Sequence, residues 1–147
     1  MGKTNTHTTS ELIATRELRA MMQGTVMLRG DDDYARMRRI WNRAVENQPT
    51  LIAVCETSTD VQAAVRVARR HNLPFSVRGG GHDWTGRALC TDGLVIDLSQ
   101  MREVVADPRS RVAIVSGGAS AKDVAAAAGA HGLVAALRYR CAASLEG

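Results

Sequence analysis

The order of apolar and polar positions predicts a strand, a helix and a second strand in the middle of the chain. Residues 51–55 and 75–78 are short apolar runs, which are typical of buried strands. Residues 61–71 lie between them and carry apolar side chains at the spacing of one helix face. These side chains are Val61, Ala64, Val65 and Ala68. Because a strand–helix–strand unit of about thirty residues joins parallel strands through a right-handed crossover, we expect the two strands to run parallel.

Two helices and a short extended piece are predicted before this unit. Residues 10–22 have the pattern of a short amphipathic helix, which Gly24 ends. Residues 26–30 are extended, and residues 31–33, three aspartates, then cap a second helix. Its apolar positions are Tyr34, Met37, Ile40, Trp41 and Val45. A metal site is the alternative for three aspartates, but this stretch lacks the alternating ligands and closing glutamate of an EF-hand.

The second half of the chain predicts one more strand, a hairpin and a helix. Residues 94–98 are a third apolar run, and residues 101–106 and 111–116 flank a turn that contains Pro108, as in an antiparallel hairpin. Residues 120–123 cap an alanine-rich helix that Gly132 ends, as residues 57–60 cap the earlier one. We therefore expect an α+β fold: a small parallel βαβ sheet with flanking helices, followed by the start of a second, antiparallel α+β subdomain.

Three consecutive glycines, Gly79, Gly80 and Gly81, follow the strand at 75–78. Parallel sheets present ligands at the carboxyl ends of their strands, and a glycine backbone can direct successive N–H groups into one concavity that holds phosphate. Arg78 would add a cation. Neither of two standard phosphate motifs fits, because a Walker loop ends in Gly-Lys-Ser/Thr and a dinucleotide fingerprint needs glycine where Trp84 stands.

The run Arg78-Gly79-Gly80-Gly81-His82 resembles the Arg-x-Gly-Gly-His motif of the FAD-binding domain shared by vanillyl-alcohol oxidase and p-cresol methylhydroxylase (PCMH), most closely its berberine-bridge-enzyme-like branch. Segments around residues 51–65, 95–101 and 117–124 follow in the order and approximate spacing of that domain. The resemblance implies FAD as the cofactor, bound at its pyrophosphate by the loop amides. In many members the histidine of this motif is covalently bonded to the flavin 8α carbon, so the resemblance also implies such a bond for His82. The cofactor-binding residues would be Arg78, Gly79, Gly80, Gly81, His82, Asp83, Gly117 and Gly118.

Several of these residues have an alternative explanation in the sequence itself. Arg78 could pair with Asp97 at the end of the third strand instead of with phosphate, and Asp97 is expected to cap the turn at 99–101. His82 could be a turn histidine hydrogen-bonded to Asp83. Gly117 and Gly118 could simply permit a sharp turn from strand to helix. Trp84 could pack beside the flavin or merely cover the loop.

The resemblance divides the chain into three parts. Residues 1–32 would be a tail and short helix, residues 33–133 an incomplete PCMH-type FAD-binding domain, and residues 134–147 a divergent tail. The ring-covering segment and the substrate domain of the family are missing, so we assign no catalytic residue. A truncated product, a frameshifted tail or a split subunit would look the same. Cys141 invites comparison with the second flavin-bound cysteine of some members, but the glycines and threonine of that motif are absent.

The implied function is that of the FAD-binding portion of a flavin-dependent oxidoreductase, which passes hydride from an alcohol, sugar or alkaloid-like substrate to FAD and then to oxygen. The alternative is a noncatalytic FAD- or nucleotide-binding module, either a remnant or a partner subunit. The expected partners are FAD, a small-molecule substrate only if a substrate domain completes the chain, and a partner chain in the split arrangement.

Composition excludes several other classes. The 147 residues carry 19 basic and 15 acidic side chains, a net charge of +4, and the arginine clusters at 36–43 and 66–70 suit solvated faces. Two Trp, two Tyr and one Phe are too few for base-stacking platforms, so we expect no nucleic-acid partner. Three scattered cysteines indicate neither a disulfide framework nor a zinc site. No apolar run of about 18 residues or signal-type segment occurs, so we expect a cytoplasmic protein without membrane contact.

Overall fold

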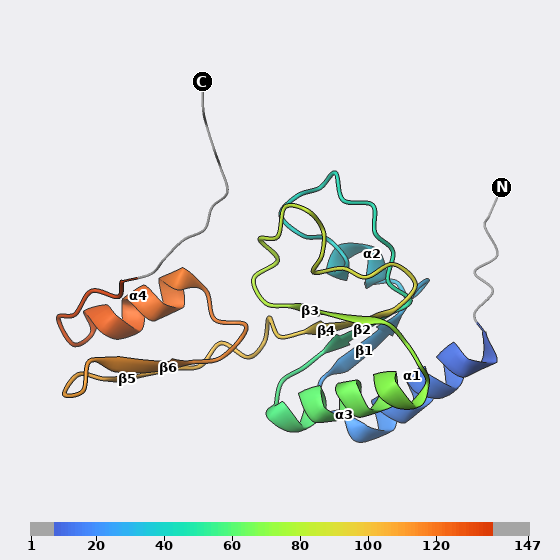
Figure 1. The fold of residues 1–147 in the computed structure, drawn as a ribbon, viewed down its shortest axis with the longest axis horizontal. Coiled ribbons are helices and arrows are strands. Elements are labelled where there is room, and N and C mark those ends of the chain that lie inside the picture. Colours follow the sequence, from blue (N-terminus) through green and yellow to red (C-terminus); the bar gives the residue numbers. More distant parts are fainter. Residues whose placement is uncertain (1–7, 137–147) are drawn as a thin grey trace.

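The computed structural model of the chain describes residues 8–136, which form a four-stranded sheet with helices and a separate two-stranded hairpin (Figure 1). The expected α+β class is confirmed. In chain order the elements are α1 (Thr9–Met21), β1 (Thr25–Leu28), α2 (Tyr34–Met37), β2 (Leu51–Val54), α3 (Ser58–Arg70), β3 (Phe75–Arg78), β4 (Leu94–Asp97), β5 (Val104–Asp107), β6 (Val112–Val115) and α4 (Ala121–Gly129).

The larger sheet has the strand order β1-β2-β4-β3. The strands β2 and β3 run parallel, as expected for the two ends of a βαβ unit, but β4 lies between them and pairs with both. Its first residue, Leu94, is the register partner of Leu51 on one side and of Phe75 on the other. β1 adds an antiparallel edge next to β2. The carboxyl ends of β2, β3 and β4 therefore meet at one edge of the sheet.

Two apolar clusters cover the two faces of this sheet. On one face α1 and α3 pack together and against the strands, and Figure 1 shows both helices on that side. The cluster there includes Leu18, Ala64, Val67, Leu94 and Ile96, all fully buried. The opposite face carries a smaller cluster, made by Ile52, Val95, Leu89, Tyr34 and Ile40. Side chains that alternate along β4 thus point into different clusters, which fixes the register of the central strand.

The helix predicted through Val45 is wrong beyond its first turn, since α2 ends at Met37. The following segment is irregular, and three of its hydrogen bonds to the loop after β3 replace the helical pattern. Trp41 N donates to Gly81 O at 3.1 Å, and Asn47 Nδ2 donates to Gly86 O at 3.1 Å and to Leu89 O at 2.6 Å. Asp33 occupies the N-cap position without a side-chain cap bond. The segment after α2 is thereby laid against the glycine loop.

The expected caps of α3 and α4 are confirmed. Thr57 and Asp60 form a reciprocal capping box at α3, and Ser120 and Asp123 form one at α4. The hairpin is also confirmed: β5 pairs antiparallel with β6, and α4 packs against it. Residues 1–7 of the predicted tail lie outside the described residues, and Cys141 does too.

Asp60 has a second task, because its buried carboxylate ties α3 to the chain before β1. Its oxygens accept backbone N–H groups from Gln23 at 2.8 Å, Glu56 at 3.0 Å, Thr57 at 3.2 Å and Gly24 at 3.3 Å. Burial alone would raise the pKa of Asp60, but these four donors favour the charged form and hold the pKa below its ordinary value. The ionised carboxylate is therefore the form that the fold stabilises.

We expect Asp60→Asn to lower the free energy of unfolding at pH 7 by about 1–3 kcal/mol, because an amide NH₂ cannot accept the donors that surround one carboxylate oxygen. A folded-state pKa below the unfolded one contributes stability above about pH 4 that is lost as the pH falls further. Urea denaturation from pH 7 to pH 2.5 should show this acid loss in the wild type and less of it in Asp60→Asn. Asp32→Asn, an exposed aspartate, is the matched control, and equal behaviour of the two variants would contradict the assignment.

Candidate functional site

A buried ion pair lies under the glycine loop. Arg78 and Asp97 are register partners at the ends of β3 and β4, their side chains are 6% and 0% exposed, and Arg78 Nη2 bonds to Asp97 Oδ2. Arg78 Nη1 also donates to Met37 O at 2.6 Å, while Asp97 Oδ1 accepts from Ser99 N at 2.9 Å. The expected Asp97 cap is thus confirmed. Of the two partners predicted for Arg78, the structure shows the carboxylate, so the arginine charge is neutralised inside the protein.

The three glycines of the loop differ in what they require. Gly81 alone of the three has a positive φ, 69°, which L side chains rarely adopt. A Cβ on Gly79 would lie 2.6 Å from Gly117 O, so this position needs glycine because two backbone segments meet there. A Cβ on Gly80 would approach only the His82 ring, with Cδ2 at 3.1 Å. Gly80 is also exposed, and it is therefore the position where a ligand can approach the backbone.

Three successive amides of the loop are available to a ligand. Within residues 8–136, the N–H groups of Gly80, Gly81 and His82 donate no hydrogen bond. Gly80 and His82 are exposed, so their N–H groups are accessible to a ligand, and successive N–H groups in a glycine turn suit an anion. This observation supports the phosphate-binding loop that the sequence predicts.

The second glycine segment reaches the first one from the hairpin. Gly118 N donates to Met101 O at 3.0 Å, and a Cβ on Gly118 would lie 1.7 Å from Leu98 O. A Cβ on Gly117 would lie 2.7 Å from Leu98 Cδ1. Both positions therefore have a packing reason for glycine. The contact of Gly117 with Gly79 nevertheless brings the two predicted parts of the site together.

His82 and Asp83 do not form the turn pair that was the alternative for this histidine. Asp83 accepts hydrogen bonds from Thr85 N and Oγ1 at 3.2 and 2.8 Å and from Ala88 N at 3.1 Å. The Thr85 hydroxyl bond, more than the opposing desolvation, lowers the pKa of Asp83. The His82 ring is exposed and has no hydrogen-bond partner within residues 8–136, so its nitrogens can react. Trp84 is 59% exposed beside it.

A hollow of ≈ 260 Å³ opens beside the loop. The three glycines line it together with Asp97 at the end of β4 and Ser99 after it, and a further wall is formed by the end of α2 and the segment after it, with Arg36, Arg39 and Trp41. The sequence did not indicate this wall, since its pattern placed Arg36 and Arg39 on the solvated face of a helix and Trp41 among the apolar positions of the same helix. The only available hint was the density of arginines at 36–43.

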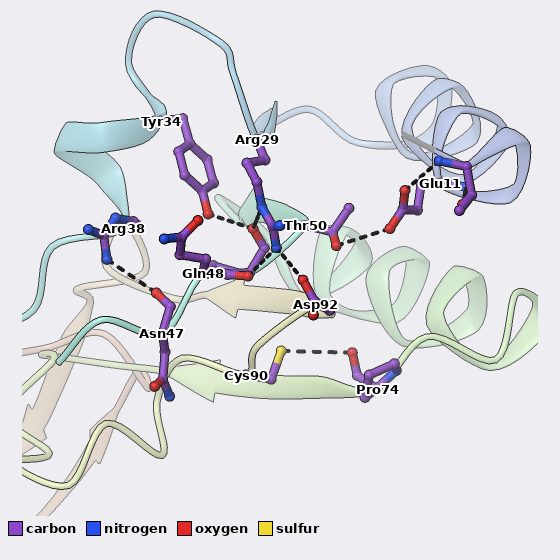
Figure 2. Close-up of polar contacts among 12 residues, drawn as sticks. Glu11, Arg29, Tyr34, Arg38, Asn47, Gln48, Thr50, Pro74, Cys90 and Asp92 are labelled. Atoms are coloured by element: carbon purple, nitrogen blue, oxygen red, sulfur yellow. Dashed lines mark hydrogen bonds and ion pairs between the residues drawn. The ribbon is translucent and has the colours of Figure 1, made fainter. Parts of the chain in front are cut away.

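A polar cluster joins Arg29 and Tyr34 to the chain before β2 and to Asp92, as Figure 2 shows. Arg29 Nη2 bonds to Asp92 Oδ1 at 2.6 Å, and its Nε donates to Pro49 O at 3.3 Å. The Tyr34 hydroxyl also donates to Pro49 O, at 2.5 Å. Burial raises the pKa of Tyr34 although the hydrogen bond of Arg29 opposes the shift. These contacts join β1 and α2 to the chain before β2 and before β4.

The described residues lack two features that would suggest other functions. No group of three or more His, Cys, Asp or Glu in residues 8–136 could hold a metal ion. No helix in the same range is long and apolar enough to cross a bilayer.

Cys55 lies in the core, where burial raises the pKa of its thiol to about 12. We therefore regard Cys55 as a residue that packs in the core.

Comparison with known proteins identifies the family. The family described as "FAD binding domain" matches residues 49–144, more than half of the chain. The chain belongs to this family. The match begins and ends later than the range 33–133 expected from the motifs. FAD-linked oxidoreductases share this domain. The family assignment therefore supports FAD as the ligand.

Curated relatives and solved structures agree with this assignment. The chain is 34% identical over 114 residues to (R)-6-hydroxynicotine oxidase of Paenarthrobacter nicotinovorans, covering 78% of this chain and 25% of that protein. It is 33% identical over 103 residues to the uncharacterized FAD-linked oxidoreductase YgaK of Bacillus subtilis, covering 70% of this chain and 23% of that protein. The chain thus spans about a quarter of the length of these relatives.

Among solved structures, 6-hydroxy-D-nicotine oxidase of Arthrobacter nicotinovorans has a TM-score of 0.74 at 34% identity, covering 78% of this chain and 25% of that one. Carbohydrate oxidase of Microdochium nivale has a TM-score of 0.68 at 27% identity, covering 77% and 24%. A berberine-bridge-enzyme-like protein of Physcomitrella patens, at 22% identity and a TM-score of 0.65, shares the fold. The PCMH-type fold expected from the motifs is therefore confirmed.

We expect Arg78→Met to lower the free energy of unfolding by about 3–5 kcal/mol, because it leaves the Asp97 carboxylate buried and unpaired. The double variant Arg78→Met, Asp97→Leu should recover part of this loss. Arg102→Met is the matched control, since the Arg102–Asp123 pair is partly exposed and such pairs contribute about 1 kcal/mol or less. Equal urea midpoints for Arg78→Met and Arg102→Met would contradict the structural role of the buried pair.

Proposed function

We propose that this chain holds FAD with its pyrophosphate at the amides of Gly80, Gly81 and His82 and with the flavin directed toward His82. The observation that carries the proposal is the row of unpaired N–H groups at the carboxyl edge of a parallel sheet, beside a hollow of ≈ 260 Å³. In open sheets this edge is where ligands bind. Membership of the FAD-binding family supports FAD as the ligand.

The predicted site residues then have different tasks. Gly79, Gly81, Gly117 and Gly118 shape the backbone, and Gly80 gives the ligand access to it. Arg78 positions the loop by anchoring its first residue to Asp97, rather than by touching phosphate. Asp83 orders the loop that carries Trp84 through its bonds to Thr85 and Ala88. The amides of Gly80 and its two successors supply the hydrogen bonds to the anion.

The second part of the proposal is a covalent bond between a ring nitrogen of His82 and the flavin 8α carbon. Forming this bond would replace one C–H bond of the 8α carbon and the N–H bond of the imidazole by a C–N bond. Two protons would be released, and the two electrons would pass to the flavin ring, which dioxygen would reoxidise. The geometry supports His82 because its exposed ring lies beside Gly80 and has no competing hydrogen bond within residues 8–136. A covalent link would hold the cofactor without requiring a closed pocket around the ring.

The activity that we propose for the complete protein is oxidation of an alcohol, sugar or alkaloid-like substrate, with hydride passing to FAD and then to oxygen. Two similar proteins are named as oxidases of 6-hydroxynicotine and of carbohydrate, which supports this class. The flavin supplies the redox chemistry, and this chain supplies binding and orientation. The competing candidate is a noncatalytic FAD-binding module. Flavin absorption that a substrate bleaches distinguishes the enzyme from the module, which would show flavin bands without bleaching.

We expect Gly80→Val to weaken FAD binding at least about 10-fold while the protein stays folded. The added side chain fills the approach to the amides, and each hydrogen bond to a charged group contributes about 1.5–3 kcal/mol. Gly80 has no positive φ that would make valine a folding defect. Flavin fluorescence titration measures the affinity, and circular dichroism checks the fold.

Two glycine variants serve as controls for Gly80→Val. Gly129→Val changes a glycine whose added Cβ meets nothing within 4 Å, so it should bind FAD as the wild type does. Gly81→Val should instead lose stability by about 1–3 kcal/mol, since valine is strained at a φ of 69°. Wild-type affinity in a folded Gly80→Val would refute the proposed phosphate loop.

We expect His82→Ala to bind FAD only reversibly, whereas the wild type, or a longer version that includes any ring-covering segment, carries flavin that survives acid precipitation. The alanine removes the only side chain to which we assign the bond and leaves the amides in place. Mass spectrometry of the tryptic peptide with His82 measures the added flavin mass. Unmodified His82 in a folded, yellow, longer protein would refute the covalent bond and leave the phosphate loop standing.

A further inference from the structure

Three arginines line the hollow beside the glycine loop: Arg36, Arg39 and Arg78. Two of them have carboxylate partners. Arg78 is bonded to Asp97, and Arg36 Nη2 lies 3.0 Å from Asp33 Oδ1. The guanidinium of Arg39 has no hydrogen bond or ion pair to any residue in the range 8–136. It is therefore the one cation of the hollow whose charge the described protein does not already compensate.

The charges around the hollow determine what the hollow can attract. Asp97 cancels Arg78, and Asp33 offsets Arg36 through an exposed pair. The positive charge of Arg39 remains, in the hollow that the glycine loop also lines. A pyrophosphate brings two negative charges, and a guanidinium matches phosphate oxygens with two parallel donors. The site as described has the amides and one free cation for this anion.

The chain holds the backbone around Arg39 against the loop. Trp41, two residues later, donates its N–H to Gly81 O at 3.1 Å, and Asn42 Nδ2 donates to Trp84 O at 2.7 Å. Arg39 also lines a neighbouring hollow of ≈ 260 Å³ together with Arg38 and Arg43. Its backbone is thus fixed at the boundary between two hollows, while its exposed side chain is free to turn toward a ligand. Binding therefore has to order the side chain of Arg39 but not its backbone.

We propose that Arg39 binds the pyrophosphate of FAD together with the glycine amides, as a binding residue outside the glycine motif. This inference rests on the proposed function, because it takes the glycine loop as the pyrophosphate site. Arg39 then determines affinity for the diphosphate part of the cofactor and contributes nothing to recognition of the isoalloxazine ring. A guanidinium contact of this kind also makes the affinity dependent on salt.

The test compares Arg39→Gln with Arg43→Gln in the full 147-residue chain. Arg43 is exposed, lies on the same segment and lines only the neighbouring hollow, so its variant removes the same charge at a slightly different place. FAD, ADP and riboflavin are the three ligands, titrated by fluorescence or calorimetry at two salt concentrations. ADP carries the diphosphate without the flavin ring, and riboflavin carries the ring without phosphate.

We expect Arg39→Gln to weaken FAD and ADP binding about 10-fold or more, to leave riboflavin binding unchanged and to reduce the salt dependence. The affinities of Arg39→Lys for FAD and ADP should lie between those of the wild type and those of Arg39→Gln. The affinities of Arg43→Gln should stay within about 2-fold of the wild type. Unchanged ADP and FAD affinity in Arg39→Gln, or equal losses in both glutamine variants, would overturn the assignment of Arg39 while the glycine loop stands. A wild-type chain that binds neither FAD nor ADP would overturn the proposed function and this inference together.

Discussion

The buried pair of Arg78 and Asp97 is the interaction on which the arrangement of the site depends. It joins the last residues of β3 and β4, and the other terminal nitrogen of Arg78, Nη1, donates to Met37 O at the end of α2. Removing two charges from water is costly, and only close geometry with additional hydrogen bonds offsets that cost. The pair has these bonds from Ser99 N and to Met37 O. One side-chain pair thereby sets the positions of the glycine loop, the turn after β4 and the wall after α2.

The same pair compensates the charge of the motif arginine within the fold. Because Arg78 is paired with Asp97, the polar groups of the loop that have no partner within residues 8–136 are the backbone N–H groups of Gly80, Gly81 and His82. The segment after α2 lies against this loop because Trp41 and Asn42 bond to it. Its arginines thereby come to the same hollow as the glycines.

Most of the fold could be predicted from the sequence because its determinants are local. The caps at Thr57 and Ser120 depend on residues three positions apart, and the apolar runs of β2 and β4 are continuous. The end of α2 could not be predicted, because its apolar spacing continues to Val45 while the hydrogen bonds that replace the helix come from residues 39 to 42 positions away. The place of β4 between β2 and β3, which gives Arg78 its partner, is equally non-local.

The candidate site shows the same limit at the level of single residues. In the sequence Gly79, Gly80 and Gly81 are equivalent members of one motif, whereas the structure gives them three different reasons to be glycine. Gly79 admits the backbone of Gly117, Gly81 takes a left-handed conformation, and Gly80 leaves the amides open. Arg39 belongs to no motif, and only the packing of its segment on the loop brings it to the hollow. The side chain of Arg39 is exposed and makes no hydrogen bond or ion pair within residues 8–136, so replacing it should cost little stability, whereas replacing the buried Arg78 leaves Asp97 without its partner.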